Sequence, residues 1–488
     1  MKLRFYSQNC FVIETGGLKI LTDPWFHPAF FTWYPYPMNR RFRSLLLCEQ
    51  ESLDYLYVSH AHFDHFDETF LKDLRKDIKV ICPDYGDKTM QKKYAALGFN
   101  HLCENLSGYL NDNVRFELLL DQSREDSALF LEESDDGVTT SFLNLNDCFI
   151  ENDRLPRNVT YLASQFSGAI HYPHSYDFPT EVKLKKIREL QQITARHCFE
   201  VVKYVNPSWF IPSAGPSRFL DPALAELNNS ETSVFYDFDY VRAEYRAVCS
   251  VPLLEMNPGD VYENGRLTPG SEEEDWDIPL WSERLREEWS AYDRERQDYN
   301  EQDIEAYFAR LKANNLAFIE VFPRRFKLVV PGRETTQAYI IVLDSATDYV
   351  ISPSPETESF NYTITLPPPL LRKILYDGWN WDNVLSTFKA ALHRNEDYYD
   401  QALFLLLTWG EYPEVISTRL KRFLGNVEMI RRDRFAYQRF CPHSGQDLTD
   451  AEIDGNVLTC PRHRWQWDLT TGRCLRGSNT PLRVGSCR

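Results

Sequence analysis

The stretch that decides the C-terminal fold is Cys441-Pro442-His443, followed after sixteen residues by Cys460-Pro461-Arg462-His463. Each of the two segments pairs one cysteine with one histidine. Two thiolates and two imidazoles can hold either a structural zinc ion or an iron–sulfur cluster. Zinc fingers usually pair cysteine with cysteine and histidine with histidine, so the mixed pairs favour the cluster.

This ligand set is typical of a Rieske [2Fe-2S] centre, in which two thiolates bind one iron and two imidazoles bind the other. The predicted cluster ligands are Cys441, His443, Cys460 and His463. High-potential Rieske proteins of respiratory complexes resemble one another in having a third cysteine in each loop. Gln446 and Arg462 stand in those places here, which is similar to the lower-potential type that supplies oxygenases with electrons.

The bulk properties are those of a multidomain globular protein. A chain of 488 residues is too long for one core and predicts two or three domains. We find no apolar run of the roughly 18–20 residues that span a bilayer. The N-terminus enters a strand pattern directly, so no signal peptide is expected. Eleven cysteines without a disulfide framework fit a reducing compartment, and we predict a cytoplasmic protein.

The net charge of −18 is unevenly distributed along the chain. Residues 412–488 contain 13 Lys and Arg against 8 Asp and Glu, a net charge of +5, so the remainder carries −23. A basic module favours docking of an acidic electron donor, such as a ferredoxin or a b-type cytochrome with its reductase. The alternative is that these arginines are merely spread over the surface. The acidic remainder argues against binding of nucleic acid.

A second group of potential ligands lies near the N-terminus. Runs typical of strands come first, at residues 3–6, 10–14 and 19–22. The β-rich run Tyr55–Ser59 then ends in His60-Ala61-His62-Phe63-Asp64-His65. Imidazoles and a carboxylate at alternating positions after a strand can converge on one or two divalent ions. The predicted ligands are His60, His62, Asp64 and His65.

This pattern resembles the metallo-β-lactamase superfamily, a four-layer αββα sandwich. The resemblance implies that His60 and His62 bind one metal and that Asp64 and His65 bind a second. It also implies a bridging Asp at the end of a later strand, for which Asp147 is the candidate. The superfamily's remaining histidines have no clear counterpart. The candidates for those places are Glu125, Asp126, His101, His171 and His174. A carboxylate in place of a histidine would make the site harder and more iron-like.

A metallo-β-lactamase-like domain joined to a Rieske module resembles the CMP-N-acetylneuraminate hydroxylase (monooxygenase) family. The matching segments are residues 21–25, 58–65, 146–148, 165–169 and 212–215. The order of the domains differs, because the Rieske module comes first in that family and last here. The resemblance implies one or two non-haem iron ions, with zinc as the alternative, and O2 with an external electron donor.

The middle of the chain carries no catalytic motif. We expect a metal-binding domain at 1–262, an acidic linker at 263–277, a small α+β domain at 278–411 and a Rieske domain at 412–488. Within the α+β domain we predict strands at 326–330, 339–343 and 362–366, and helices at 370–376 and 381–409. The predicted fold class is therefore α/β plus β, with an αββα sandwich, the α+β domain and an all-β Rieske domain.

The sequence favours a Rieske-dependent monooxygenase that hydroxylates a polar metabolite, for which the resemblance suggests a nucleotide sugar. By residue type alone, anion contacts could come from Arg196, Lys203 and Arg218. The alternative is a dinuclear zinc metallohydrolase with a redox-sensing Rieske module. The sequence leaves open whether electrons cross within one chain or between copies in a homo-oligomer.

Overall fold

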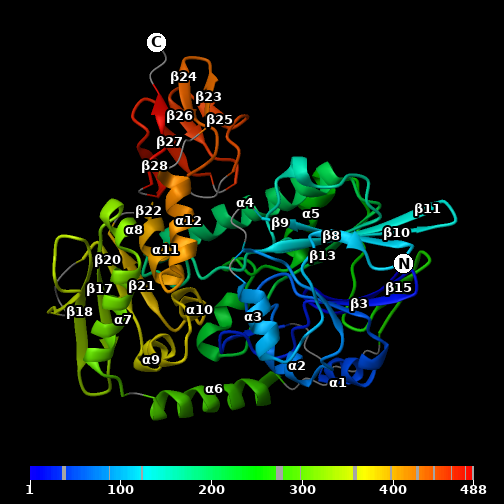
Figure 1. The fold of residues 1–488 in the computed structure, drawn as a ribbon, viewed down its shortest axis with the longest axis horizontal. Helices are drawn as coiled ribbons and strands as arrows, with labels where there is room; N and C mark the ends of the chain where they lie inside the picture. Colours follow the sequence, from blue (N-terminus) through cyan, green and yellow to red (C-terminus); the bar gives the residue numbers. More distant parts are fainter. Residues whose placement is uncertain are drawn as a thin grey trace. The chain divides into compact units, whose positions relative to one another are not determined.

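A computed structural model gives the fold of the chain (Figure 1). The residues that it describes are 1–35, 40–86, 88–121, 125–270, 278–296, 298–355, 360–395, 398–424, 428–442, 446–462, 464–478 and 480–485. Contacts divide the chain into two compact units. The first unit is Met1–Ile170 with Ile187–Leu285, and the second is His171–Lys186 with Arg286–Arg488. The predicted domain boundaries stay predictions.

Two sheets form the centre of the first unit. The first sheet runs in the order β16-β15-β1-β2-β3-β5-β6-β7. Its strands are β1 (Lys2–Ser7), β2 (Cys10–Thr15), β3 (Leu18–Thr22), β5 (Tyr55–Tyr57), β6 (Lys79–Ile81), β7 (Leu102–Cys103), β15 (Val261–Glu263) and β16 (Arg266–Thr268). The strands β3, β5, β6 and β7 are parallel neighbours, as expected where helices connect successive strands.

The second sheet runs in the order β13-β12-β11-β10-β9-β8. Its strands are β8 (Ser107–Tyr109), β9 (Val114–Leu120), β10 (Ser127–Asp135), β11 (Val138–Asn146), β12 (Tyr161–Gln165) and β13 (Trp209–Ser213). Pairing is antiparallel from β8 to β11 and parallel from β11 to β13.

Side chains that alternate along the strands separate the layers. The core between the two sheets includes Ile13, Tyr57, Phe116, Phe142 and Ile211.

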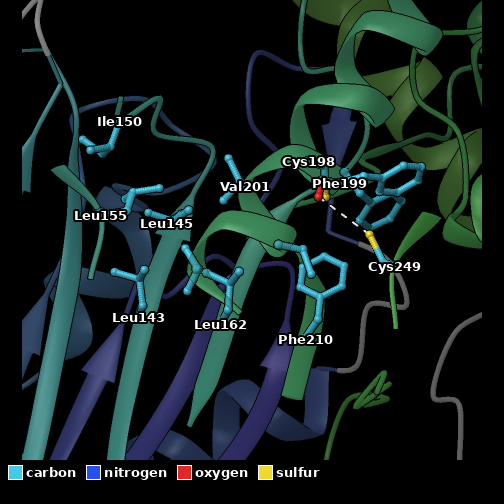
Figure 2. Packing of buried hydrophobic residues seen from close by; sticks show 14 of the residues in the cluster. Leu143, Leu145, Ile150, Leu155, Leu162, Cys198, Phe199, Val201, Phe210 and Cys249 are labelled. Carbon is cyan, nitrogen blue, oxygen red and sulfur yellow. Dashed lines mark hydrogen bonds between the residues drawn. The ribbon is translucent and has the colours of Figure 1, made fainter. Parts of the chain in front are cut away.

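Helices cover the outer face of each sheet, the face that points away from the other sheet. The outer face of the first sheet packs against α2 (Glu68–Asp73) and α3 (Thr89–Ala96), and Leu56, Phe70 and Tyr94 belong to one core there. On its other face, the second sheet packs against α4 (Thr180–Val205) and α5 (Phe238–Val248). Figure 2 shows that core, with Leu143 and Leu162 of the sheet near Val201 and Phe199 of α4. These four layers are the predicted αββα sandwich.

The second unit contains a smaller sheet in the order β19-β18-β17-β20-β21. Its strands are β17 (Arg324–Pro331), β18 (Thr336–Leu343), β19 (Ile351–Pro353), β20 (Tyr362–Thr365) and β21 (Ala391–Arg394). The helices around it include α7 (Glu301–Asn314), α8 (Leu316–Val321), α9 (Pro368–Tyr376), α10 (Trp381–Leu385) and α11 (Gln401–Trp409). These elements give the predicted α+β character.

One prediction in this region is wrong. Residues 381–409, predicted as one helix, contain two helices separated by β21. The first helix, α10, ends at Leu385, and three residues later Phe388 has a φ of +56°, which a helix does not allow. The second begins at its N-cap Asp400, whose side chain accepts a hydrogen bond from the Leu403 amide.

The C-terminal residues of the second unit form two small sheets. One runs in the order β22-β28-β27-β26-β25 and the other in the order β23-β24-β29. The strands are β22 (Tyr398–Tyr399), β23 (Met429–Arg432), β24 (Phe435–Gln438), β25 (Glu452–Asp454), β26 (Val457–Thr459), β27 (Gln466–Asp468), β28 (Cys474–Ser478) and β29 (Val484–Gly485). Their common core includes Tyr437, Cys441, Leu458, Cys460 and Trp467.

Part of the predicted linker 263–277 still belongs to the first sheet. The strand β16 pairs with β15 as an exposed hairpin, and residues 271–277 lie outside the described residues. Within the helices that the structure describes, we find none with the length and apolar character needed to span a membrane.

Candidate metal centre

The site begins where two parallel strands of the first sheet end. Thr22 at the end of β3 lies opposite Tyr57 at the end of β5. Asp23, directly after β3, and Ser59, two residues after β5, therefore lie at the same edge of the sheet. Side chains that follow the carboxyl ends of parallel strands form the usual binding crevice of such sheets.

The second sheet contributes its own parallel ends. Asn146 at the end of β11 lies opposite Ser164, and Gln165 at the end of β12 lies opposite Ser213. Asn146 has a left-handed backbone with φ of +46°, and its side-chain oxygen accepts a hydrogen bond of 2.7 Å from the Asp147 amide. This turn fixes the position of the Asp147 carboxylate.

Three of the predicted ligands form a compact group. One ligand atom from each of His60, His65 and Asp147 lies within 4.8 Å of the other two. His65 Nε2 is 3.4 Å from Asp147 Oδ1 and 3.9 Å from Asp64 Oδ2. This separation between nitrogen and oxygen leaves room for a cation between them, since metal–ligand distances are about 2.0–2.2 Å.

His60 and His62 also converge. His60 Nε2 lies 2.8 Å from His62 Nδ1. Two nitrogens that bind one ion at about 2.0–2.1 Å are about 3 Å apart, so this spacing suits a shared metal. The other ring nitrogen, His60 Nδ1, lies 3.2 Å from Asp126 Oδ1. Asp126 can therefore act as a further ligand or orient the His60 ring.

Glu125 is positioned differently from Asp126. The backbone amides of both residues donate hydrogen bonds to Asp121 Oδ1, at 2.8 Å and 3.1 Å. This turn directs the Asp126 carboxylate to His60.

The second nitrogen of His65 is held by a buried carboxylate. His65 Nδ1 lies 3.1 Å from Asp23 Oδ2, and Asp23 is 1% exposed. The Ser59 amide donates a 2.7 Å hydrogen bond to Asp23 Oδ1, and Asn9 Nδ2 donates one of 2.5 Å to Asp23 Oδ2. The Ser59 hydroxyl lies 3.1 Å from Nδ1 of both His60 and His65. A carboxylate behind a histidine fixes its tautomer and leaves Nε2 for a metal.

Burial and the neighbouring charges shift the pKa values of the side chains in this group. Burial would lower the pKa of His60, but the carboxylates of Asp126 and Asp147 outweigh burial and raise that pKa to about 9. Burial likewise opposes protonation of His65, yet Asp147 and Asp23 raise its pKa well above the ordinary value. Burial raises the pKa of Asp126 to about 6. Burial would also raise the pKa of Asp147, but His65 and His60 lower it. A metal cation would replace these protons.

The residues fit a divalent metal. Asp147 Oδ1 is buried and accepts no hydrogen bond from the residues that the structure describes. An orphaned buried carboxylate oxygen is costly unless a cation contacts it. Three imidazoles and three carboxylates form a mixed donor set that suits iron, and zinc as well. This group is therefore a candidate metal centre.

A pocket opens at the metal centre. Asp64, His65 and Asp147 form its polar end, and the rest of its wall comes from Gln8, Trp25, Gln165, Gly168, Ala169, Ala214, Gly215 and Ser217. Gln8 Nε2 donates a 2.7 Å hydrogen bond to the Pro216 carbonyl, which ties the turn between β1 and β2 to the segment after β13. This wall gives a substrate polar contacts beside the metal.

The Rieske ligands are described in part. Cys441 and Cys460 are 3% and 0% exposed and lie in one core. The Cys441 amide donates a 2.8 Å hydrogen bond to the Gln446 carbonyl, and the Cys460 amide donates one to the Trp465 carbonyl, also at 2.8 Å. The backbone of each buried cysteine is therefore held by a hydrogen bond to a residue five positions later. The other predicted ligands, His443 and His463, lie outside the described residues.

The remaining candidates lie elsewhere. His101 is exposed and precedes β7. His171 and His174 belong to the second unit. Arg196 and Lys203 are exposed on α4, and Arg218 forms an ion pair with Asp237.

Sequence reasoning did not assign roles to Asp23, Ser59, Gln8 and Gln165. A buried Asp directly after an apolar strand and before proline is a signal that could have indicated Asp23. Gln8 and Gln165 carried no signal of comparable strength.

Comparison with known proteins identifies two domains in the chain. Residues 2–197 match the beta-lactamase superfamily domain, and residues 417–484 match the Rieske [2Fe-2S] domain. A protein of Mycolicibacterium smegmatis named "Putative Rieske 2Fe-2S iron-sulfur protein" is 30% identical over 515 residues, which cover 97% of each chain. The chain belongs to the family of this mycobacterial Rieske protein.

More distantly related proteins also match this chain. The cytidine monophosphate-N-acetylneuraminic acid hydroxylase of Xenopus laevis is 24% identical over 434 residues, which cover 82% of this chain and 70% of the relative. Among solved structures, an isothiocyanate hydrolase from Delia radicum gut bacteria matches with a TM-score of 0.36 and 14% identity. That match covers 54% of this chain and 99% of the other. The chain thus joins a metallo-β-lactamase fold to a C-terminal Rieske domain, and its Rieske domain implies a redox partner.

Proposed function

We propose that this protein is a Rieske-dependent non-haem iron monooxygenase that hydroxylates a polar metabolite. The observation that carries the proposal is the pairing of a metal centre with an electron carrier in one chain. The group around His60, His65 and Asp147 fits a divalent metal. The buried Cys441 and Cys460 lie in a Rieske domain. A hydrolase needs no electrons, whereas an oxygenase does.

The reaction would be RH + O2 + 2 e⁻ + 2 H⁺ → ROH + H2O. A Rieske cluster carries one electron at a time, so the external donor must reduce it twice in each turnover. When bound, the iron would supply the site at which O2 is reduced and the substrate oxidised.

The protein's own residues hold and shape the centre. His60 and His62 would hold one ion, and Asp64 and His65 would hold a second. Asp126, at the other ring nitrogen of His60, would orient that ring. Asp147, with an oxygen that faces both His60 and His65, would bridge them. Behind these ligands, Asp23 fixes the His65 ring.

The polar lining of the pocket suits a polar group of the substrate beside the metal ligands. Gln8, Gln165 and Ser217 line it beside the metal ligands, and amides and hydroxyls give directed hydrogen bonds to polar groups. The name of the Xenopus laevis relative favours a nucleotide sugar such as a CMP-sialic acid.

The partner would be an acidic electron carrier, such as a ferredoxin or a b-type cytochrome with its reductase. The net charge of +5 on residues 412–488 supports this choice, since opposite charges steer encounter.

The experiment is metal analysis combined with low-temperature EPR of anaerobically purified protein, before and after dithionite. We expect a reduced Rieske signal and more iron than the cluster alone requires. Substrates would then be screened by O2 uptake. A Rieske signal with zinc in the front site, and no O2 uptake, would instead support the dinuclear zinc metallohydrolase.

A further inference from the structure

The segment His171–Lys186, which we call the strap, belongs to the second unit although it interrupts the first in sequence. It lies along β21. The Asp177 amide donates a 3.0 Å hydrogen bond to the Leu392 carbonyl, and the Leu392 amide donates one of 2.8 Å to the Ser175 carbonyl. Ala169, which lines the metal pocket, precedes the strap by two residues. The strap is therefore a short covalent connection from the pocket into the second unit.

The second cluster loop lies against an aromatic residue of the same unit. The Cys460 amide donates its hydrogen bond to the Trp465 carbonyl. The Trp465 ring packs directly on Gly477, where an added Cβ would lie 2.2 Å from Trp465 Cγ. The centre of the Trp465 ring is 6.4 Å from that of Tyr399. Glycine at 477 therefore leaves room for the indole, which is tilted by 56° to the Tyr399 ring.

Strand pairing fixes the position of Tyr399. It lies on β22, which pairs in parallel with β28, with Tyr399 opposite Ser478. Nearby, the Thr480 hydroxyl donates a 3.1 Å hydrogen bond to Gln401 Oε1. Tyr399 thus joins the Rieske sheet to the α+β part of the unit.

From Tyr399 a series of ring contacts reaches the strap. Tyr399 stacks on Phe404, with ring centres 5.0 Å apart and planes 14° apart. Phe404 lies 5.4 Å from Tyr362 in an edge contact. The hydroxyl of Tyr362 lies 2.7 Å from that of Tyr176, a strap residue. Phe404, Tyr362 and Tyr176 are all at least 95% buried.

We propose that these rings carry electrons from the cluster to the strap. The aromatic chain consists of Trp465, Tyr399, Phe404, Tyr362 and Tyr176. Electron transfer through protein slows steeply with each gap between bonded or contacting groups. Here every step from the Cys460 loop to Tyr176 is a hydrogen bond, a covalent bond or a ring contact. The proposal rests on the proposed oxygenase function.

The electron balance of one transfer is simple. The reduced cluster loses one electron and returns to its oxidised form. Metal held by the front-site ligands would be the acceptor, with O2 as the final oxidant, and the rings undergo no net change. Burial raises the pKa of Tyr362 and Tyr399 well above that of free tyrosine. Both phenols therefore stay protonated, and the rings remain neutral throughout.

The test measures reoxidation of the cluster in the full-length holoprotein. Dithionite-reduced protein is mixed with O2, and the return of cluster absorbance is followed by stopped flow. We expect Tyr399→Leu to slow reoxidation by at least an order of magnitude, because the ring is lost. Tyr399→Phe keeps the ring and should keep the rate. Tyr362→Phe removes the hydroxyl contact with Tyr176 and should slow reoxidation by a smaller factor.

Phe308→Leu is the matched control. Phe308 is a fully buried ring of the same unit, packed on Phe326 and Trp381 outside the aromatic chain. The Phe308→Leu substitution should leave the rate of cluster reoxidation unchanged. The EPR spectrum and reduction potential of the cluster, recorded for each variant, should match those of the wild type. A shifted potential in Tyr399→Leu would assign the slowing to the cluster and overturn the route.

A preparation without front-site metal distinguishes a failure of the proposed oxygenase function from a failure of the proposed electron route. If wild-type reoxidation is as fast without front-site metal, the oxygenase function fails, and the route fails with it. If reoxidation depends on the metal but is equally fast in Tyr399→Leu, the route alone is overturned.

Discussion

His65 Nδ1 lies 3.1 Å from Asp23 Oδ2, so a fully buried carboxylate orients a predicted metal ligand from behind. Loss of such a partner typically costs about 10–100-fold in metal affinity. We therefore expect Asp23→Asn to weaken metal binding by a factor in this range. Titration of the chelator-treated protein with Fe²⁺ or Zn²⁺ against a competing chelator measures the metal affinity of the variant and of the wild type.

Asp67 provides a control for this prediction. It is a buried carboxylate 2.9 Å from His27 Nδ1 that is not among the predicted metal ligands, and it caps α2. Asp67→Asn should lower the free energy of unfolding but leave metal affinity unchanged. Equal losses of affinity in the two variants would mean that Asp23 acts only through stability.

Asp126 and Glu125 can be tested as neighbours with opposite expectations. Asp126 Oδ1 lies 3.2 Å from His60 Nδ1, and the amides of Glu125 and Asp126 both donate hydrogen bonds to Asp121 Oδ1. Asp126→Asn should therefore lower metal content, and Glu125→Gln should not. Metal analysis of both purified variants checks this. A loss in Glu125→Gln alone would move the ligand role to Glu125.

Much of the site could be predicted because its ligands are local in sequence. His60, His62, Asp64 and His65 follow one strand, and their spacing alone brings them together. Asp147 needed the superfamily resemblance, since 82 residues separate it from His65. Asp23 depends on the parallel pairing of β3 with β5, which a single sequence does not specify.

The incorrect prediction of a single helix over residues 381–409 has a similar cause. Its apolar residues fit a helical period locally, yet β21 is held by pairing with β20, where Ile364 lies opposite Leu392. Long-range pairing overrode the local pattern. The strap was missed because its partner strand lies more than 200 residues away.

The cluster and the front site should be separable. Cys460 is fully buried in the core of the C-terminal sheets, and the metal group belongs to the other unit. We expect Cys460→Ser to abolish the Rieske EPR signal and turnover, while front-site metal content stays unchanged. The same outcome is predicted for His443→Ala. Substrate hydroxylation by a cluster-free variant would contradict the oxygenase mechanism.

Acid should destabilise the second unit through His171. Burial lowers the pKa of His171 from 6.5 to about 4, with Arg394 acting in the same direction and Asp382 opposing. His174 is similarly shifted to about 4 by burial, Lys183 and His171. The unfolded chain therefore binds more protons than the folded chain between these pH values.

It follows that the stability due to neutral His171 is fully present above about pH 6.5 and is lost as the pH falls toward 4, by about 3 kcal/mol in total. Urea unfolding at a series of pH values measures this slope. His171→Gln should flatten it, while His101→Gln, at an exposed site, should leave it unchanged. An identical slope in His171→Gln and the wild type would show that other groups govern acid unfolding.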